Sequence, residues 1–191
     1  ESGVVSTSNY EARKYGVKSG MPIREAIGKL RGTDAVFLPV NHELYSKISQ
    51  GVMEIVGGYG ERFEYASIDE GILEITQTAN ENFENAKTIA EKIKKEIFEK
   101  FRLTCSIGIG PNKLIAKIAS DFRKPNGLTV VKPGETDSFL GPMEAGKIPS
   151  IGKKSAEFLA ALGIRTIAAL RNADRGMIVA TFGKKIGGWI V

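Results

Sequence analysis

The sequence predicts an α+β protein in which an antiparallel or mixed sheet is layered by helices and followed by a smaller helical unit. Two short apolar runs, residues 63–68 and 72–76, are typical of strands, and a long amphipathic helix is expected at residues 83–101. From the first of these strands the expected order is β, β, α, β, α, β, which suits a sheet covered by helices. The composition then changes at residues 132–135, Lys-Pro-Gly-Glu, which are interpreted as a linker into short helices.

The first forty residues are predicted to form two strands and two short helices. Gly16 is expected to end the first helix, and Pro22 lies near the first turn of the second, where an N–H group has no helical partner. Pro39 falls near the end of the second strand. The expected strands are 3–7 and 35–40, and the expected helices are 9–15 and 21–30.

Apolar spacing predicts the longer helices. Between residues 42 and 56 the apolar side chains recur every three or four positions, and between 83 and 101 they form one stripe opposite a face of Glu and Lys. The remaining expected elements are a strand at 103–109, a helix at 112–122, a strand at 128–131 and short helices at 138–140, 154–162, 167–170 and 177–181.

The predicted strands at residues 63–68 and 72–76 are joined across Asp69-Glu70-Gly71. Neighbouring side chains on one straight strand point to opposite faces of a sheet, so Asp69 and Glu70 can share a site only where the chain turns. Gly71 permits a tight hairpin turn at this point. A hairpin at Asp69-Glu70-Gly71 is therefore a structural condition for any joint role of the two carboxylates.

Composition limits the classes of function. The 191 residues carry a formal net charge of +5, which favours an anionic partner, nucleic acid first. Cys105 and His42 are the only cysteine and histidine, so an internal disulfide is impossible, and nothing points to a zinc cluster or a serine–histidine triad. Cys105 lies in a predicted strand and is interpreted as packing, and a reduced compartment inside the cell fits its isolation. No apolar run reaches the ~18 residues of a membrane span.

The pair Asp69 and Glu70 is the first candidate site. Mg²⁺ takes oxygen ligands and is often held by one or two carboxylates together with substrate phosphates. Two such ions, about 3.5–4 Å apart, can clamp the attacking and leaving oxygens of a phosphoryl displacement. By itself an Asp-Glu pair is more often a solvated turn.

A second candidate is the stretch Ile148-Pro149-Ser150-Ile151-Gly152-Lys153-Lys154. A tight turn between two short helices exposes backbone N–H groups that bind a nucleic-acid phosphate without reading sequence, and the lysines add charge there. The pattern resembles a helix-hairpin-helix motif, in which the usual turn is Gly-Ile-Gly. Here Ser150 takes the first position, where glycine tolerates a positive φ better. The alternative is an ordinary αα-hairpin.

Two further groups have the chemistry of phosphate binding. Tyr10 and Arg13 lie three residues apart on one face of a predicted helix, where a hydroxyl beside a guanidinium suits a phosphate, although a solvated helix face is the commoner interpretation. A basic cluster, which becomes functional only if it faces Asp69, is formed by Lys113, Lys117, Arg123 and Lys124.

Taken together, these motifs resemble the Y-family translesion DNA polymerases of the DNA polymerase IV type. The resemblance runs from about residue 2 to residue 164 and rests on four motifs. They are Asn-Tyr-Glu-Ala-Arg-Lys-Tyr-Gly-Val-Lys-Ser-Gly-Met-Pro at 9–22, Ser-Ile-Asp-Glu at 67–70, Lys-Leu-Ile-Ala-Lys-Ile-Ala-Ser-Asp at 113–121 and Lys-Pro-Asn-Gly-Leu at 124–128.

The resemblance implies a domain organisation. Residues 1–38 would be part of a small fingers subdomain, residues 39–131 a palm-like sheet with helices, and residues 132–191 a helical thumb that carries the helix-hairpin-helix-like turn.

The resemblance also implies roles for individual residues. Asp69 and Glu70 would be the catalytic, metal-binding carboxylates for two Mg²⁺ ions, with Glu70 at the primer 3′ end. The implied contacts are Thr7, Tyr10, Arg13 and Lys124 to the triphosphate of a deoxynucleotide, Val4, Ser6, Gly20 and Met21 near the nascent base pair, and Pro149, Ser150, Ile151, Gly152 and Lys153 to the DNA backbone.

The sequence departs from the family pattern in three places. The family's first metal-binding Asp, its ribonucleotide-excluding aromatic residue and its C-terminal little finger have no counterpart here. After Glu70 the family often has Ala-Tyr-Leu-Asp, whereas this chain has Gly71-Ile72-Leu73-Glu74. We therefore expect a piece of a longer protein, inactive by itself for lack of the third carboxylate and of one palm strand.

The expected activity of the intact protein is template-directed nucleotidyl transfer in lesion bypass. Its expected partners are primer–template DNA, deoxynucleoside triphosphates and a sliding clamp bound through a C-terminal tail, and its expected location is the cytoplasm, at the nucleoid. Two alternatives remain: a palm-type nucleotidyl cyclase, and a non-catalytic DNA-binding module built on the helix-hairpin-helix.

Overall fold

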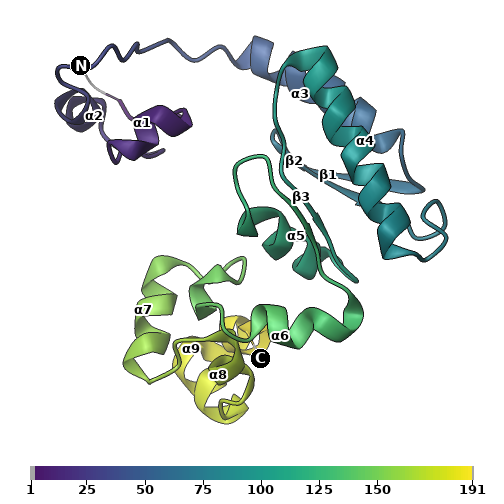
Figure 1. The fold of residues 1–191 in the computed structure, drawn as a ribbon. Helices are drawn as coiled ribbons and strands as arrows, with labels where there is room; N and C mark the ends of the chain where they lie inside the picture. The colour runs from purple at the N-terminus through teal and green to yellow at the C-terminus, as the bar shows by residue number, and fades with distance from the viewer. Residues whose placement is uncertain (1–2, 191) are drawn as a thin grey trace. The chain divides into compact units, whose positions relative to one another are not determined.

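The computed structural model describes the backbone of residues 3–190, which Figure 1 traces from one end to the other. The chain divides into two compact units, Glu1–Lys47 and Ile48–Val191. Both contain helices, and the second also contains paired strands. The mixed α+β class predicted from the sequence is confirmed.

The first unit contains two short helices, α1 (Tyr10–Lys14) and α2 (Ile23–Lys29). Helix α1 begins at Asn9 because the Asn9 side chain accepts a hydrogen bond of 2.9 Å from the backbone N–H of Ala12, which otherwise has no partner inside the helix. Both helices were predicted, each with wider bounds. They enclose a small core of Val5, Val17, Ala26 and Leu30.

Neither strand expected in the first forty residues forms. Residues 3–7 contribute only one isolated antiparallel bridge, between Val4 and Pro22. Within the described part of the chain no segment pairs with residues 35–40, and Leu38 there is 79% exposed. Both predictions were wrong because an apolar, β-branched run becomes a strand only where a neighbour satisfies its backbone hydrogen bonds.

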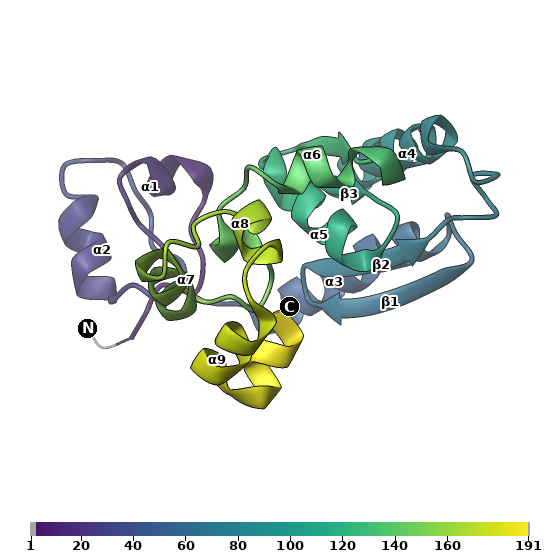
Figure 2. The same ribbon diagram turned by 90° about the horizontal axis from the view of Figure 1, so that it is seen from below.

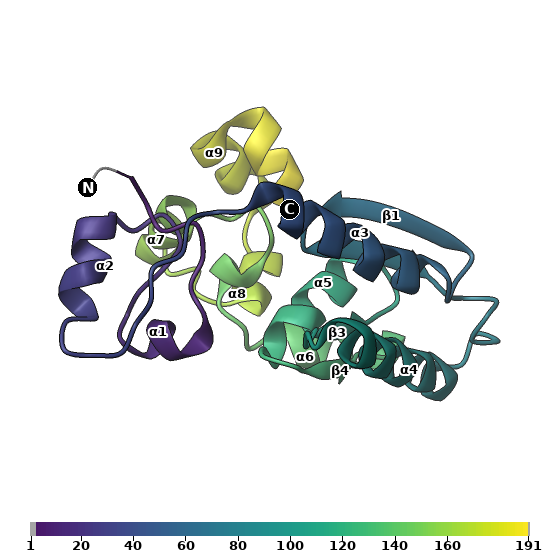
Figure 3. The ribbon, with the colours of Figure 1, turned by 90° about the horizontal axis from the view of Figure 1, so that it is seen from above.

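A hairpin and a long helix form the start of the sheet region. Helix α3 (His42–Gly57) precedes β1 (Arg62–Ser67), which pairs antiparallel with β2 (Glu70–Glu74). The register is regular except for a shift between Tyr65 and Ser67. Figure 3 shows α3 running along the hairpin, so the helix covers one side of these strands.

The hairpin turn lies one residue earlier than predicted. We expected residues 69–71 to form it, but the turn residues are Ile68 and Asp69, and Ser67 pairs with Glu70 across the strands. The irregular register in β1 allows this because it shortens the loop to the two residues that tight hairpins favour.

Two glycines in the sheet region are explained by close neighbours. A Cβ atom on Gly71 would lie 2.6 Å from the ring of Phe63, so this glycine serves packing inside β2 and not the turn. A Cβ atom on Gly108 would lie 2.1 Å from the carbonyl oxygen of Ala116 and 2.3 Å from the amide nitrogen of Ser120. The strand of Gly108 can therefore approach the next helix backbone directly.

The second half of the sheet region follows the predicted order. Helix α4 (Phe83–Phe101) leads to β3 (Ile107–Ile109), helix α5 (Lys113–Phe122) crosses over, and β4 (Leu128–Val130) pairs parallel with β3. Strand β3 begins later than the predicted residue 103. Over the described residues the strands form two separate two-stranded sheets, β1–β2 and β3–β4, with α5 beside them (Figure 2).

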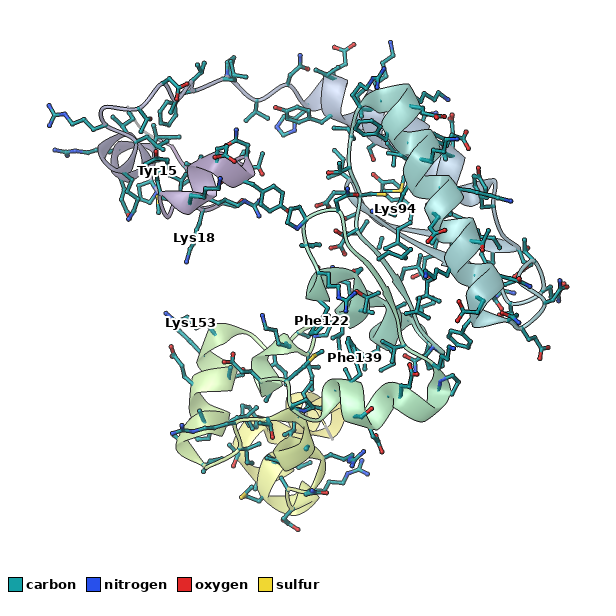
Figure 4. The ribbon with its side chains drawn as sticks, in the orientation of Figure 1. Tyr15, Lys18, Lys94, Phe122, Phe139 and Lys153 are labelled. Atoms are coloured by element: carbon teal, nitrogen blue, oxygen red, sulfur yellow. The ribbon has the colours of Figure 1, made fainter. Side chains whose placement is uncertain are left out.

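The remainder is helical, as predicted. Two single-turn segments, η1 (Pro133–Glu135) and η2 (Ala145–Lys147), alternate with the helices. Helix α6 (Thr136–Leu140) rests on α5 through a T-shaped pair of rings, Phe122 and Phe139, whose centroids are 5.1 Å apart (Figure 4). The other helices are α7 (Lys153–Ala161), α8 (Ile167–Arg171) and α9 (Arg175–Ile190).

The helices after α6 share one core. The largest side chains buried there are Ile151, Leu159, Ile164, Leu170 and Ile178. None of the described helices is both long and apolar enough to cross a membrane.

Candidate functional site

The candidate catalytic carboxylates lie at the tip of the β1–β2 hairpin. Asp69 is an exposed turn residue, and Glu70 is the half-buried first residue of β2. The Ser67 hydroxyl donates to Asp69 Oδ1 over 2.7 Å. From α3, the Ser49 hydroxyl donates to the carbonyl oxygen of Ile68 over 2.5 Å. Both ends of the turn are therefore held by serine hydroxyls. The hairpin on which the shared-site prediction depends forms one residue earlier than expected, with Asp69 in the turn and Glu70 in the strand.

Helix α5 supplies a cation to the hairpin. Lys117 donates to the carboxylate of Glu70, and its Nζ also lies 3.3 Å from Asp121 Oδ2. Burial lowers the pKa of Lys117, but the hydrogen bond to Glu70 and the charges of Asp121 and Glu70 outweigh burial and raise that pKa overall. The charged form of Lys117 is therefore favoured, and its two ion pairs join Glu70 of β2 to Asp121 of its own helix.

Asp121 contacts a second lysine, Lys124, in addition to Lys117. Burial raises the pKa of Asp121, but hydrogen bonds from Lys124 and Lys117 and the charges of both lysines outweigh burial and lower it overall. Lys124 Nζ lies 2.6 Å from Asp121 Oδ1. Lys124, an expected triphosphate contact, follows the end of α5. Its ammonium is oriented by Asp121, three residues earlier in the sequence.

The basic cluster does face the hairpin. Lys113 pairs with Glu64 of β1, and Lys117 pairs with Glu70 of β2. The described contact of Lys124 is to Asp121 rather than to Asp69. The described contacts join these lysines to Glu64, Glu70 and Asp121 and none of them to Asp69, so the functional role of the cluster stays a prediction.

The turn after Lys124 is fastened to α4. The ammonium of Lys94 donates to the Asn126 side-chain oxygen over 2.6 Å and to the Asn126 carbonyl oxygen over 3.1 Å, and also to the carbonyl oxygen of Cys105 (Figure 4). Asn126 has φ of 57°, a left-handed conformation that asparagine tolerates better than most residues. Burial raises the pKa of the Cys105 thiol while the charge of Lys94 lowers it, and the net rise fits the interpretation of Cys105 as packing.

The hairpin tip offers the type of ligand that Mg²⁺ takes, with two carboxylates rather than the three that the resemblance implies. Asp69 offers exposed carboxylate oxygens, the donors that Mg²⁺ prefers. Glu70 offers a second carboxylate, which Lys117 contacts. Among the side chains of residues 3–183, which the structure describes, no group of three or more His, Cys, Asp or Glu gathers as a metal site.

The first unit holds the other expected nucleotide contacts. Arg13 lies with its guanidinium carbon 5.2 Å from the ring centroid of Tyr10, and its Nε donates to the carbonyl oxygen of Ser8 over 3.1 Å. The two side chains therefore do share one helix face. The remaining expected residues are the exposed Val4, Ser6, Thr7 and Gly20, with φ of 80° at Gly20, and the half-buried Met21.

The candidate DNA-backbone turn connects η2 to α7. Ser150 has φ of 73°, the positive value for which glycine is the favoured residue. Ile151 is buried and anchors the turn in the helical core, whereas Gly152 is exposed and precedes the first residue of α7. Pro149 is half-buried, and Lys153, 90% exposed in its side chain, stands at the start of α7 (Figure 4). The turn therefore has a positive φ at the position where the motif usually has its first glycine, and its role in DNA binding stays a prediction.

Sequence reasoning missed three residues that shape the hairpin tip. Ser49 is far away in sequence, and no sequence signal links it to the turn. Ser67 is adjacent to the turn, so its polar side chain was a usable signal. Asp121 lies four residues after Lys117, a spacing that places both on one face of α5, and three residues before Lys124.

Comparison with known proteins gives a consistent result. A sequence profile of the impB/mucB/samB family matches residues 1–121. A protein of Methanosarcina mazei named DNA polymerase IV 2 is 48% identical over 182 residues, which are 95% of this chain and 48% of that protein. DNA polymerase IV of Nitrosopumilus maritimus is 44% identical over 191 residues, which are 100% of this chain and 52% of that protein.

Solved structures extend the comparison to the fold. A crystal structure of DinB from Sulfolobus solfataricus has a TM-score of 0.93 and 38% identity, covering 99% of this chain and 55% of that one. An insertion ternary complex of Dbh DNA polymerase also has a TM-score of 0.93 and 38% identity, covering 99% and 54%. The chain spans about half the length of the curated relatives it matches. With the profile matching more than half of its residues, the chain belongs to the impB/mucB/samB family and is of the Y-family DNA polymerase IV type.

Proposed function

We propose that the intact protein is a template-directed DNA polymerase that extends primers across damaged templates. The primer 3′-oxygen attacks the α-phosphorus of a deoxynucleoside triphosphate, and pyrophosphate leaves. The observation that supports the proposal is the hairpin, in a chain of this family, whose turn contains Asp69 and is followed at once by Glu70.

The carboxylates act as the metal-holding end of the site. Asp69 and Glu70 would hold Mg²⁺, which supplies positive charge where charge develops on the transferring phosphate. The chain's own contribution is positioning: Ser67 orients the Asp69 carboxylate, and Ser49 holds the carbonyl end of the turn.

The other proposed residues contact different parts of the substrates. Thr7, Tyr10, Arg13 and Lys124 hold the triphosphate, while Val4, Ser6, Gly20 and Met21 lie near the nascent base pair. The turn of Pro149, Ser150, Ile151, Gly152 and Lys153 binds the DNA backbone through its N–H groups and the Lys153 charge, hence without sequence preference. A sliding clamp as partner and a location at the nucleoid in the cytoplasm complete the proposal.

The decisive experiment uses the full-length protein with primer–template DNA, Mg²⁺ and deoxynucleoside triphosphates. Incorporation that follows the template supports the proposal. DNA binding without Mg²⁺-dependent binding of triphosphate would identify a non-catalytic helix-hairpin-helix module. Conversion of a triphosphate to a cyclic nucleotide without a template would identify a cyclase.

We also propose that the 191-residue chain by itself does not extend a primer. Among the described residues no third acidic side chain joins Asp69 and Glu70. Robust extension by the isolated chain in the same assay would refute this.

A further inference from the structure

Four charged side chains form an unbroken alternating line across two elements of the second unit. Glu70 of β2 contacts Lys117, Lys117 contacts Asp121 over 3.3 Å, and Asp121 contacts Lys124 over 2.6 Å. Lys117 and Asp121 lie four residues apart on one face of α5, and Lys124 follows two residues after the helix ends at Phe122. The line begins at a proposed metal-holding carboxylate and ends at a proposed triphosphate-binding lysine.

We infer that Lys117 and Asp121 are positioning residues that couple the two ends of the site. Lys117 fixes the Glu70 carboxylate, and Asp121 fixes the ammonium of Lys124, while their mutual ion pair ties one end to the other. This inference rests on the proposed function, because only that function gives Glu70 and Lys124 a common substrate.

The physical argument is one of preorganisation. A free lysine side chain samples many rotamers, and each must be given up when a phosphate binds. An acid that already holds Lys124 reduces that loss. Lys117 does the same for Glu70, since its ammonium bridges carboxylates from a strand and a helix.

A purely structural role is the competing explanation. Exposed ion pairs contribute little to folding stability, and all four side chains are between one third and one half exposed. The effect of removing them should therefore appear in ligand binding and leave the melting temperature nearly unchanged.

The test measures binding of a non-hydrolysable deoxynucleoside triphosphate to the full-length protein with DNA, by calorimetry over a range of Mg²⁺ concentrations. Asp121→Asn should raise the Kd of the triphosphate by about two- to fivefold, the size that an exposed ion pair carries. Lys117→Met should raise the Mg²⁺ concentration needed for half-maximal binding by a similar factor. Lys117→Arg, which preserves the charge, should restore most of that loss.

Lys95→Met is the matched control, because Lys95 forms an exposed ion pair with Glu99 on α4, outside the proposed site. It should change neither the Kd nor the Mg²⁺ requirement. If Lys117→Met lowers the Mg²⁺ requirement, Lys117 merely repels the ion, and the inference is overturned. Unchanged binding in both Lys117→Met and Asp121→Asn overturns it as well.

Two further measurements separate the possible failures. If Lys117→Met does not fold, Lys117→Arg and Asp121→Asn still test the two contacts. If Asp69→Asn also leaves Mg²⁺-dependent triphosphate binding unchanged, the proposed function has failed. If only Asp69→Asn impairs it, the function stands and the coupling does not.

Discussion

At the scale of single residues, the sequence indicated candidate site residues where they are neighbours along the chain. Asp69 and Glu70 were identified because they are adjacent, and Tyr10 and Arg13 because a helix face follows from their spacing. Ser49 could not be identified, because its contact with the turn depends on the packing of α3 against the hairpin. Long-range contacts of this kind leave no pattern in one sequence.

Ser150 should lower the free energy of unfolding, because its backbone has a positive φ. Its φ of 73° disfavours a side chain by about 1–2 kcal/mol, partly offset by the larger backbone freedom that glycine loses on folding. We expect Ser150→Gly to raise the free energy of unfolding by about 0.5–1 kcal/mol in urea denaturation. Ser155→Gly, inside α7, is the control and should destabilise by about as much. A loss of stability in Ser150→Gly would contradict the account of this turn.

Asp121 should stabilise the fold in a pH-dependent way. Its lowered pKa means that the folded state favours the charged carboxylate, so the contribution is present above the unfolded pKa of about 3.9 and is lost as the pH falls through the folded-state value. We expect Asp121→Asn to cost less than about 1 kcal/mol near neutral pH, since the pair is half exposed. The difference between wild type and variant in denaturant unfolding should vanish in acid. A difference that widens in acid would contradict the assignment.

At the scale of elements, packing distances decide which residues are allowed. The backbone of β3 approaches α5 so closely at Gly108 that any Cβ atom would overlap backbone atoms, which cannot rotate away. Gly108→Ala should therefore destabilise the protein by about 1–3 kcal/mol in thermal or urea unfolding. Gly134→Ala is the control, because nothing lies within 4 Å of the added atom. Equal, small effects of the two substitutions would mean that the two elements are not in direct contact.

Helices were predicted better than strands, for a physical reason. The periodicity of α4 and α5 is carried within each helix, so a single sequence reveals it. A strand depends on a partner: residues 35–40 have the composition of a strand, yet no described segment pairs with them. The hairpin turn was placed one residue late because the register shift in β1 arises between strands and not within either.

At the scale of the whole molecule, the chain combines a candidate catalytic hairpin with a candidate DNA-backbone turn at residues 149–153. The family relation supports both, and the chain spans about half of its relatives' length. The fingers, palm and thumb bounds expected from the sequence stay predictions. Catalysis and DNA binding can be tested separately, by substitutions in the hairpin and in the DNA-backbone turn.

Lys153 should contribute affinity for DNA without sequence preference. Its exposed charge at the start of α7 is suited to a phosphate, and a phosphate contact contributes about one unit to the salt dependence of binding. Lys153→Glu in the full-length protein should weaken duplex binding about equally for unrelated sequences and reduce the salt slope. Lys87→Glu on α4 is the control for the same change in net charge. A loss confined to certain sequences would argue against backbone recognition.

The central claim, that the hairpin tip is the catalytic end of a polymerase, is tested most directly by Asp69→Ala in the full-length protein. Primer extension and duplex binding are measured on the same preparation, with Glu91→Gln, an exposed acid on α4, as the control. We predict that extension is abolished in Asp69→Ala while the Kd for duplex DNA stays within about twofold, because Asp69 is an exposed turn residue that the fold does not need. Unimpaired extension, or an equal loss of extension and DNA binding, would contradict the claim.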